Sequence, residues 1–361
     1  MRVLQLITRA ELGGSQRYVA ELAKRQRECG FEVELASGTL GWLNDQRECF
    51  TRVHHIPDLV REIAPAHDSA ALAHLLRFLR RRRYDVVHTH CSKAGFLGRI
   101  AAAAVGVPVV AHTSHGTILS ESISTGRRAL YWAAEQTAAL VTHRLFAVSR
   151  TDQELLRRSL HTRASALRVM TIVPGYIRRM PAAWRLSEES RWDLVAIGNL
   201  YVNKAYDVLL PAVARVARAH PRLRLTIFGE GPERPALEAQ LERLSLRPRV
   251  RMAGRIVDAA SSLARAGAYV LPSRKEGLPL ALLEAMATGA PIVATDVGAV
   301  REALGPSAPL ARADDPDDLA RRLDELLSSD AHRLALASAA RASFERLLPA
   351  DDPGVTPLMY A

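Results

Sequence analysis

One stretch in the C-terminal third of the chain, residues 271–289, constrains the fold more than any other. It reads L-P-S-R-K-E-G-L-P-L-A-L-L-E-A-M-A-T-G and follows the short apolar run of residues 268–271. Pro279 suits the first position of a helix because its missing N–H costs nothing there. Gly289 suits the residue that ends a helix. The pattern predicts a strand, a polar loop and a helix over residues 280–288.

Two carboxylates lie around this loop, and their position indicates a ligand. Glu276 precedes the helix N-terminus, which attracts phosphate, and Glu284 lies about one turn inside the helix. Ionised carboxylates only accept hydrogen bonds, so hydroxyl groups are their natural partners. Sugar hydroxyls on either side of a diphosphate would fit, which describes a nucleotide sugar. The spacing is equally compatible with an amphipathic helix that has one solvated glutamate and one turn glutamate.

The rest of the chain repeats an alternation of strands and helices in both halves. Residues 2–7 are expected to form a buried strand, and Gly13 and Gly14 lie in the loop before the helix of residues 16–29. The rhythm restarts with a strand at 194–198, followed by a polar loop with Asn199 and Lys204. We predict an α/β fold of two doubly wound parallel sheets. The glycine pair does not match G-x-G-x-x-G, which disfavours a dinucleotide site.

Polar residues follow two neighbouring strands of the first half. His90, Ser92 and Lys93 come after a strand at 85–89, and His115 follows a strand at 107–112. Ligands of open α/β sheets bind at the carboxyl ends of strands. One histidine alone is more often structural, but the two together favour a functional role.

Composition limits the partners and the compartment. The net charge is +11, and residues 1–175 hold 24 Lys and Arg against 15 Asp and Glu. Aromatic residues make up only 5% and do not alternate with basic ones, so nucleic acid is disfavoured as a partner. The basic run at 77–83 suits an anionic membrane surface or simply a solvated helix end. Three scattered cysteines and no recognisable leader predict a cytoplasmic protein. The basic N-terminal half is compatible with a peripheral position at the inner face of the membrane.

Several segments together resemble the family-4 glycosyltransferases of the GT-B fold, over nearly the whole chain. They are E-L-G-G-S-Q-R-Y-V-A-E-L-A, D-V-V-H-T-H-C-S-K-A-G, H-G at His115, V-P-G, G-N-L-Y-V-N-K, F-G-E-G-P-E-R, and P-S-R-K-E-G-L-P-L-A-L-L-E-A-M-A-T-G-A-P-I-V-A-T-D-V-G. The segment I-P-D-L-V-R-E-I-A-P-A-H-D is similar to the branch that builds capsules, exopolysaccharides and related surface glycans.

The resemblance implies a domain plan and a reaction. Two Rossmann-like domains would face each other across a cleft: residues 1–176 would bind the acceptor and residues 177–345 the nucleotide sugar, with a tail at 346–361 packing back on the first domain. The activity implied is a retaining, metal-independent transfer of a hexose from a nucleotide sugar, with UDP preferred and GDP open. The acceptor would be a glycan or polyprenyl-linked sugar. The nucleotide sugar is a substrate, so no cofactor is expected.

The resemblance also implies residue roles. Glu276 would contact the sugar hydroxyls of the donor, Glu284 the ribose, and Lys204 the leaving phosphate in place of a metal. His115 would lie near the reacting carbon on the acceptor side, with His90, Ser92 and Lys93 as further acceptor-side candidates. The predicted donor site also includes Gly13, Gly14, Asn199, Gly277, Leu278, Pro279 and Leu280.

The chain departs from the family pattern at one position. The family usually has arginine five residues before Lys204, and this chain has Asn199, which cannot supply a bidentate cation. Another cation, such as Arg274 or Lys275, would have to substitute, or turnover would be slower. Two alternatives therefore stay open: a sugar-nucleotide epimerase of the same fold, and a subunit that binds nucleotide sugar without catalysis.

Overall fold

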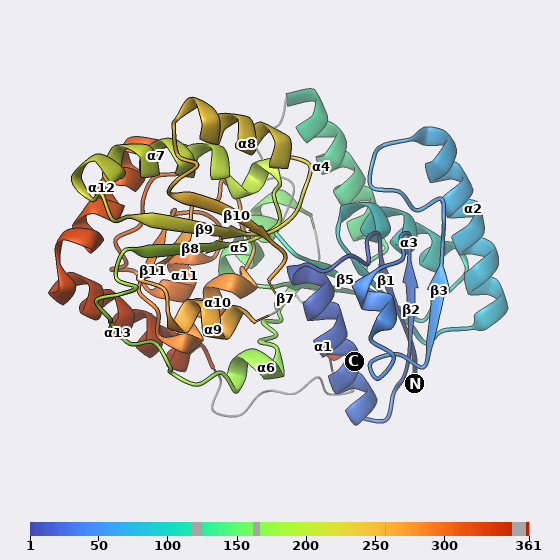
Figure 1. Ribbon diagram of the computed structural model, residues 1–361. Helices are drawn as coiled ribbons and strands as arrows, with labels where there is room; N and C mark the ends of the chain where they lie inside the picture. The colour runs from blue at the N-terminus through green and yellow to red at the C-terminus, as the bar shows by residue number, and fades with distance from the viewer. Residues whose placement is uncertain (117–124, 162–166, 257, 349–358, 361) are drawn as a thin grey trace. The chain divides into compact units, whose positions relative to one another are not determined.

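The chain divides into two units, each built on its own parallel sheet (Figure 1). The computed structural model describes residues 1–116, 125–161, 167–256, 258–348 and 359–360. Unit 1 comprises Met1–Pro174 with Ala350–Ala361, and unit 2 comprises Gly175–Pro349. The predicted second domain ended at residue 345, but its last helix continues to Leu347.

Unit 1 contains a seven-stranded sheet in the order β3-β2-β1-β4-β5-β6-β7, with every neighbouring pair parallel. The strands are β1 (Arg2–Ile7), β2 (Glu32–Ser37), β3 (Arg52–His55), β4 (Val86–His90), β5 (Val109–Ser114), β6 (Arg144–Ala147) and β7 (Leu167–Val169). The helices are α1 (Gly14–Glu28), α2 (Pro65–Arg82), α3 (Ser92–Ala104), α4 (Thr125–Leu140) and α5 (Arg150–Ser159).

Side-chain alternation along the strands of unit 1 decides what lies on each face of its sheet. Leu4 and Leu6 of β1 and Val87 of β4 pack with α2 and α3 in one apolar cluster. Successive residues of a strand point to opposite faces. Gln5, His88 and His90 therefore lie on the other face, where α1 packs. This alternation places an unusual set of polar side chains in the interior.

Unit 2 contains a five-stranded parallel sheet in the order β10-β9-β8-β11-β12. The strands are β8 (Asp193–Ile197), β9 (Arg224–Phe228), β10 (Val250–Gly254), β11 (Ala268–Leu271) and β12 (Ile292–Ala294). The helices are α6 (Gly175–Arg178), α7 (Tyr206–Ala219), α8 (Arg234–Arg243), α9 (Ala259–Ala264), α10 (Leu280–Thr288), α11 (Val300–Leu304), α12 (Pro316–Ser328) and α13 (Asp330–Leu347).

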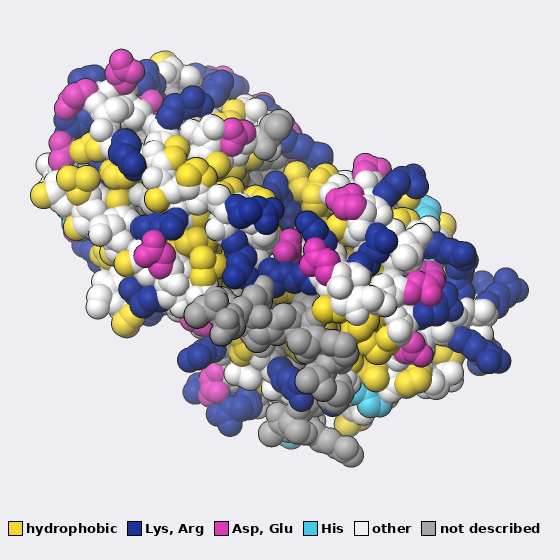
Figure 2. Space-filling model, turned by 90° about the horizontal axis from the view of Figure 1, so that it is seen from below, with side chains coloured by type: hydrophobic (Ala, Val, Ile, Leu, Met, Phe, Trp, Pro, Cys, Tyr) yellow, Lys and Arg dark blue, Asp and Glu magenta, His cyan; other side chains and the backbone are white. Residues whose placement is uncertain are grey.

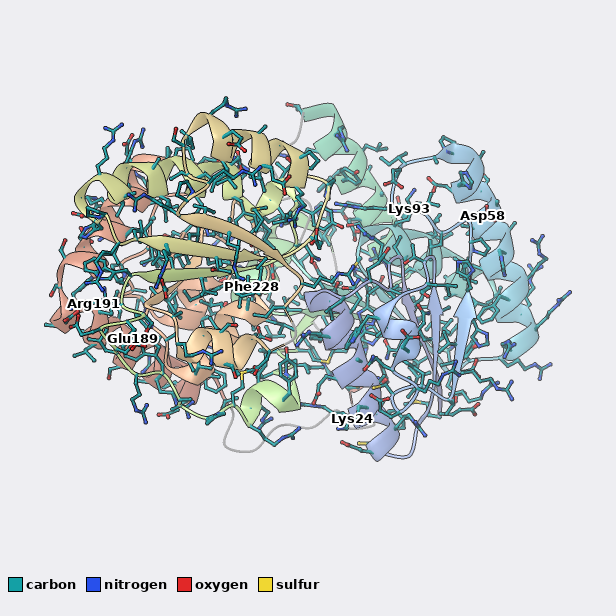
Figure 3. All side chains as sticks on the ribbon, viewed as in Figure 1. Lys24, Asp58, Lys93, Glu189, Arg191 and Phe228 are labelled. Carbon is teal, nitrogen blue, oxygen red and sulfur yellow. The ribbon has the colours of Figure 1, made fainter. Side chains whose placement is uncertain are left out.

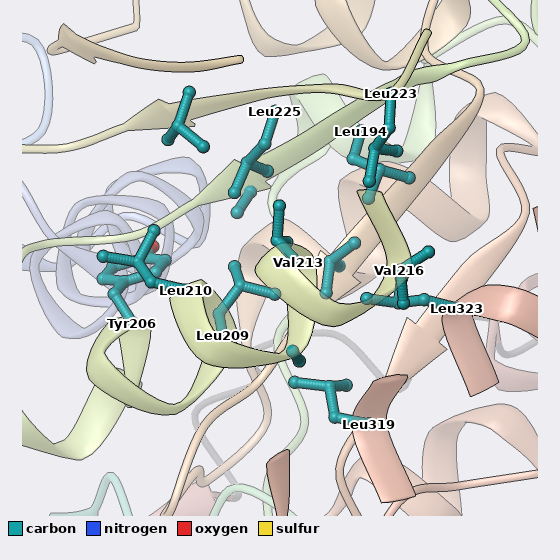
Figure 4. Packing of buried hydrophobic residues seen from close by; sticks show 14 of the residues in the cluster. Leu194, Tyr206, Leu209, Leu210, Val213, Val216, Leu223, Leu225, Leu319 and Leu323 are labelled. Carbon is teal, nitrogen blue, oxygen red and sulfur yellow. The ribbon is translucent and has the colours of Figure 1, made fainter. Parts of the chain in front are cut away.

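The core of unit 2 lies between its sheet and helices α7 and α12 (Figure 4). Leu209 and Val213 of α7 and Leu319 and Leu323 of α12 are fully buried there. Burying one such side chain contributes roughly 1.5–3 kcal/mol. This packing holds the carboxyl ends of β8 and β11, and hence the loops after them, in a rigid frame.

The sequence predicted the elements around the opening stretch closely and one strand poorly. Helix α10 spans Leu280–Thr288 as expected, Pro279 is its N-cap, and Gly289 ends it with φ +78°. From the sequence alone, the apolar residues 169–173 predict a strand, but the strand in this region, β7, ends at Val169. An apolar run alone does not reveal which of its residues pair with a neighbour.

Candidate functional site

The loops after β8, β11 and β12 meet at the carboxyl end of the unit 2 sheet. Glu276 lies in the loop between β11 and α10, and Lys204 ends the 3₁₀ turn Val202–Lys204 that follows β8. Adjacent parallel strands end at the same edge, so the two loops are neighbours although 72 residues separate these side chains.

Glu276 is the centre of this site and is almost fully buried, with 8% of its surface exposed. Lys204 Nζ donates to its Oε1 at 2.6 Å, and Ser273 Oγ donates to the same oxygen at 2.6 Å. Among the described residues both side-chain hydrogen bonds to this carboxylate go to Oε1. The second oxygen can accept a hydrogen bond from a ligand hydroxyl.

The backbone around Glu276 is held by the loop after β12. The amide of Ala299 donates to the carbonyl oxygen of Gly277 at 3.2 Å. A Cβ atom on Gly298 would lie 1.9 Å from the carbonyl oxygen of Glu276, and Gly298 has φ +51°. Only glycine allows this approach without strain.

Helix α10 begins directly after the Glu276 loop. Its first N–H groups lack carbonyl partners within the helix and carry a partial positive charge. Leu280 is its first residue, and Gly277 and Leu278 precede the N-cap. Pro279 has no N–H, so an anion here would be bound by the amides of Gly277, Leu278 and Leu280.

Glu284 lies in the second turn of α10 and is 5% exposed. The hydroxyl of Tyr176, on α6, donates to its Oε1 at 2.7 Å. The sequence placed Glu284 about one turn inside the helix, and the structure agrees. It adds Tyr176, which belongs to the V-P-G-Y-I segment and whose hydroxyl stabilises a buried carboxylate.

Arg274 does not supply the positive charge that an arginine at the position of Asn199 would provide. Its guanidinium binds Asp207 through two hydrogen bonds of 2.8 and 2.7 Å and Asp314 at 2.5 Å. Its Nη1 also donates to the carbonyl of Val202 at 2.7 Å, and its amide donates to the carbonyl of Asn203 at 2.9 Å. Two carboxylates neutralise the guanidinium, so the sequence-based suggestion that Arg274 substitutes is not supported. Arg274 instead stabilises the turn that ends at Lys204, through its hydrogen bonds to the carbonyl groups of that turn.

Replacing Arg274 with alanine is therefore expected to slow turnover by displacing Lys204. Displacements of about 1 Å in a reacting constellation can cost about a hundredfold, and we expect a loss of ten- to a hundredfold in kcat. The measurement is steady-state turnover together with the melting temperature. Arg224→Ala is the matched control, because it breaks an Arg–Asp pair with Asp193 at the opposite end of the sheet. Equal losses in both variants would contradict this role for Arg274.

The carboxyl end of the unit 1 sheet brings His90 and His115 together. His90 ends β4 and His115 follows β5. His90 Nδ1 and His115 Nε2 are 3.1 Å apart, and the Tyr18 ring meets His115 edge-on at 4.8 Å between centroids. Gly13 is the extended N-cap of α1 and Gly14 its first residue. The two histidines that follow neighbouring strands thus contact each other directly.

Burial keeps these histidines neutral. It lowers the pKa of His115 to about 3, and it lowers the pKa of His90 well below its usual value, with repulsion from His88 adding to the effect. At neutral pH both rings are uncharged, so each donates one hydrogen bond and accepts one. The ring of His115 therefore offers an uncharged hydrogen-bonding group at this end of the sheet.

Two other acceptor-side candidates lie at the start of α3. Ser92 is its first residue, and Lys93, labelled in Figure 3, forms a salt bridge with Asp68 of α2. From the sequence alone, Asp68 could cap a helix that begins at residue 69, but α2 begins at Pro65. The carboxylate compensates the charge of Lys93, and this weakens the case for Lys93 as an anion-binding group.

Sequence reasoning missed the residues that support the predicted ones. They are Ser273 and Tyr176 beside the two glutamates, Asp207 and Asp314 around Arg274, and Gln5, Gln26 and Tyr360 behind His90. One signal was present in the sequence: Gln5 interrupts the apolar run R-V-L-Q-L-I. The other residues come from distant segments that no local pattern connects.

The two parallel sheets and the loops at their carboxyl ends define the fold class of the protein. Over 96% of its length the chain superimposes on the sucrose-phosphate synthase of Thermosynechococcus elongatus, with a TM-score of 0.81 over 95% of that chain and 19% identity. The fold is GT-B, with two Rossmann-like domains, as the sequence predicted.

Family models and curated relatives then place the chain within this class. The model for glycosyl transferases group 1 matches residues 191–329, and the glycosyl transferase 4-like domain model matches residues 13–175. A D-inositol 3-phosphate glycosyltransferase of Thermobispora bispora is 31% identical over 91% of this chain and 85% of its own. The chain belongs to the group 1, family 4-like glycosyltransferases.

A further relative is similar over a shorter stretch. The UDP-Gal:alpha-D-GlcNAc-diphosphoundecaprenol alpha-1,3-galactosyltransferase of Escherichia coli is 29% identical over 74% of this chain and 72% of its own. Within the part of the chain that the structure describes, no helix has the length and apolar character needed to cross a membrane.

Proposed function

We propose that this glycosyltransferase transfers a hexose from a UDP-sugar to a glycan or lipid-linked sugar, with retention of anomeric configuration, in surface polysaccharide synthesis. The observation that carries the proposal is the Lys204–Glu276 pair beside the N-terminus of α10. The relative in Escherichia coli, whose name specifies a UDP-galactose donor and a diphosphoundecaprenol-linked acceptor, supports the choice of substrates. GDP stays open as the nucleotide.

Each donor-site residue has a role that follows from its contacts. Glu276 is held by Lys204 and Ser273 through Oε1, and its second oxygen orients a sugar hydroxyl. Glu284, oriented by Tyr176, binds a ribose hydroxyl. The amides of Gly277, Leu278 and Leu280 bind the diphosphate at the helix N-terminus. Gly13 and Gly14 allow close approach of the first domain's backbone to phosphate.

The chemical step builds negative charge on the leaving nucleoside diphosphate. Its bond to the anomeric carbon breaks, the acceptor oxygen forms a new bond to the same face of that carbon, and the acceptor proton passes to a departing phosphate oxygen. Lys204 and the N-terminus of α10 are preorganised to stabilise that charge, which lowers the barrier. An ammonium group has three donors, so Lys204 can contact phosphate while it keeps Glu276 in place.

The same proposal includes transfer without a metal ion, and it places the acceptor beside His115. The positive charge of Lys204 and the helix end would serve where other transferases use a metal ion. His115, with His90 and Ser92, would contact the acceptor. Because His115 is neutral, it would accept or donate a hydrogen bond to the acceptor hydroxyl without adding charge.

A lipid-linked acceptor would require access to the membrane surface. Helix α2 ends in Arg80, Arg81 and Arg82, and its C-cap is Arg83. Such a basic end contributes about 1 kcal/mol per residue near anionic lipid. Over the face seen in Figure 2, basic and acidic side chains are interspersed, so any attraction would come from local groups such as this helix end. We propose a cytoplasmic protein, peripheral at the inner face of the membrane.

The test is nucleotide release from a panel of UDP- and GDP-sugars, with and without a polyprenyl-diphosphate-linked sugar presented in anionic vesicles. We expect release that depends on the acceptor and is specific to one donor, with the same anomeric configuration in donor and product. Interconversion of UDP-sugars without acceptor would show an epimerase. Saturable donor binding without release on any acceptor would overturn catalysis and point to Asn199.

A further inference from the structure

A chain of hydrogen bonds runs through the interior of unit 1 from the C-terminus of the protein to His115. His90 Nε2 is 2.6 Å from Gln5 Oε1, Gln5 Nε2 donates to Gln26 Oε1 at 2.7 Å, and Gln26 Nε2 donates to the hydroxyl of Tyr360 at 2.7 Å. The Tyr360 hydroxyl also lies 2.8 Å from His88 Nδ1, and His88 Nε2 lies 2.7 Å from Thr113 Oγ1.

This chain of hydrogen bonds is buried away from solvent except at the end formed by His115. Gln5, Gln26, His88 and His90 are fully buried, and Tyr360 is 5% exposed. His115 is partly exposed. Buried polar groups are stabilised only when each donor meets an acceptor. The donors along this buried series of hydrogen bonds must therefore all point the same way. That common direction decides which ring nitrogen of His115, at the accessible end, carries the proton.

The direction follows from the carboxamides. A carbonyl oxygen only accepts, so His90 must donate from Nε2 to Gln5 Oε1. The ring of His90 is neutral, because burial holds its pKa well below the usual value. Nδ1 of His90 then carries no proton and accepts a hydrogen bond from His115 Nε2. His115, also neutral, is left with a bare Nδ1 that accepts a hydrogen bond.

If the oxygen and nitrogen atoms of both carboxamides, Gln5 and Gln26, changed places, every hydrogen bond between them and His115 would run the other way. Some group must therefore select one of the two arrangements. The NH₂ group of Gln26 faces two groups of the C-terminal tail: the Tyr360 hydroxyl at 2.7 Å, which can donate or accept, and Met359 Sδ at 3.9 Å, which can only accept. A carbonyl oxygen in that place would meet the sulfur lone pairs with no hydrogen to share. The tail therefore orients Gln26, and through it Gln5, His90 and His115.

We propose that Met359 and Tyr360 are positioning residues which, through Gln26, Gln5 and His90, fix His115 as the tautomer protonated at Nε2. The proposal deepens the proposed function, because a bare Nδ1 suits His115 to accept a hydrogen bond from an acceptor hydroxyl. It assigns a role in the reaction to the C-terminal tail, whose Tyr360 lies 245 positions along the polypeptide from His115.

The first measurement is the tautomer of His115, which does not require activity. Protein labelled with ¹⁵N in its histidine rings is compared by long-range ¹⁵N–¹H correlation spectra, with the His115 signals assigned from a His115→Gln variant. We expect the wild type to show one tautomer, with Nε2 protonated. Tyr360→Phe removes the hydroxyl and keeps the ring, and we expect its two ring nitrogens to move towards a common averaged shift.

Two further variants separate positioning from simple loss of stability. Gln26→Leu breaks the same chain without altering Tyr360, and it should give the same spectral change. Tyr84→Phe is the control, because the Tyr84 hydroxyl is also buried in unit 1 but donates to Glu34 at 2.7 Å. We expect Tyr84→Phe to leave the His115 spectrum unchanged even if it lowers the melting temperature as much as Tyr360→Phe does.

Kinetics supply the second readout. With donor and acceptor established, Tyr360→Phe should lower kcat by about tenfold, as for partners that orient an active group indirectly, and should change the donor KM by less than about twofold. An unchanged His115 spectrum in both Tyr360→Phe and Gln26→Leu would overturn the proposal, whatever the turnover. If the wild type shows no transfer at all, the proposed function fails while the spectra still decide the tautomer.

Discussion

Replacing Glu276 with alanine is expected to reduce kcat/KM by a factor of about 10²–10³, the usual cost of losing one preorganised polar contact in a transition state. The carboxylate is buried and held by Lys204 and Ser273, so its second oxygen is fixed in direction before a ligand binds. Its removal also frees Lys204 from the geometry in which it would contact phosphate. The measurement is steady-state turnover with the donor that the panel identifies.

The fold should survive this change. Glu276 lies in a loop, and the partner left behind, Lys204, has a side chain that is 21% exposed and can be solvated. Breaking a buried ion pair costs about 3–5 kcal/mol when the charge left behind stays buried, but the ammonium of Lys204 can reach water, so the melting temperature should fall while the protein stays folded. A rate equal to the wild type in a folded Glu276→Ala protein would remove Glu276 from the mechanism.

Two further substitutions define what Glu276 contributes. Glu276→Gln keeps the size and the hydrogen bond from Ser273 but removes the charge, so it tests whether the pair with Lys204 requires a carboxylate. Glu238→Ala is the control, because it breaks a Glu–Arg pair on the surface of the same unit, with Arg234 at 2.9 Å. We expect Glu238→Ala to turn over at the wild-type rate.

Unit 1 is expected to lose stability steeply on mild acidification. Burial lowers the pKa of His88 to about 3, aided by repulsion from His115, and burial alone lowers the pKa of His115 to about 3. Burial also lowers the pKa of His90 and His112 well below the usual value, with Arg99 contributing at His112. These four rings must take up protons when the unit unfolds in acid.

The sign of the effect follows from where the protons bind. Below the usual histidine pKa of about 6.5 the unfolded chain binds more protons than the folded one, so stability falls as the pH falls. Each ring that stays neutral costs about 1.4 kcal/mol per pH unit between that pKa and its folded value. Above about pH 6.5 the contribution is constant. Four such losses at pH 5 amount to about 8 kcal/mol, which is comparable to a domain stability of about 5–15 kcal/mol.

Hydrogen exchange between pH 7 and pH 4.5 measures this loss unit by unit. We expect the amides of β1, β4 and β5 to lose protection first, while those of β8 and β11 keep theirs. His115→Asn removes one of the four rings and should shift the acid midpoint to lower pH. Equal stability of unit 1 at pH 7 and pH 5 would contradict the neutral state of these histidines.

Much of the fold could be predicted from local patterns. The helix of residues 280–288 was predicted to the residue because a proline at its start and a glycine at its end each have a backbone requirement that the sequence displays. The parallel sheets followed from the alternation of strands and helices. The strand expected at 169–173 was misplaced, because apolar composition does not reveal which residues find a hydrogen-bonding partner.

The sequence proposed members of the candidate site but could not give the contacts between them. Glu276, Glu284 and Lys204 were identified by motif, and the structure adds that Lys204 and Glu276 contact each other while Tyr176 holds Glu284. Arg274 was suggested as a substitute cation, and the structure instead places it on Asp207 and Asp314. A sequence shows that a residue carries charge, but not which distant carboxylate neutralises it.

The amino-acid sequence by itself carried the motifs that resemble the family and its GT-B fold, and it predicted the parallel sheets and the residues at the ends of the strands, because periodicity, capping and loop chemistry act between near neighbours in the chain. The tertiary structure alone decided how the polar interior of unit 1 is connected. Gln5, Gln26, His90 and Tyr360 come from four distant segments, and packing β1, α1, β4 and the C-terminal tail together is what excludes water and leaves these groups only one another as hydrogen-bond partners.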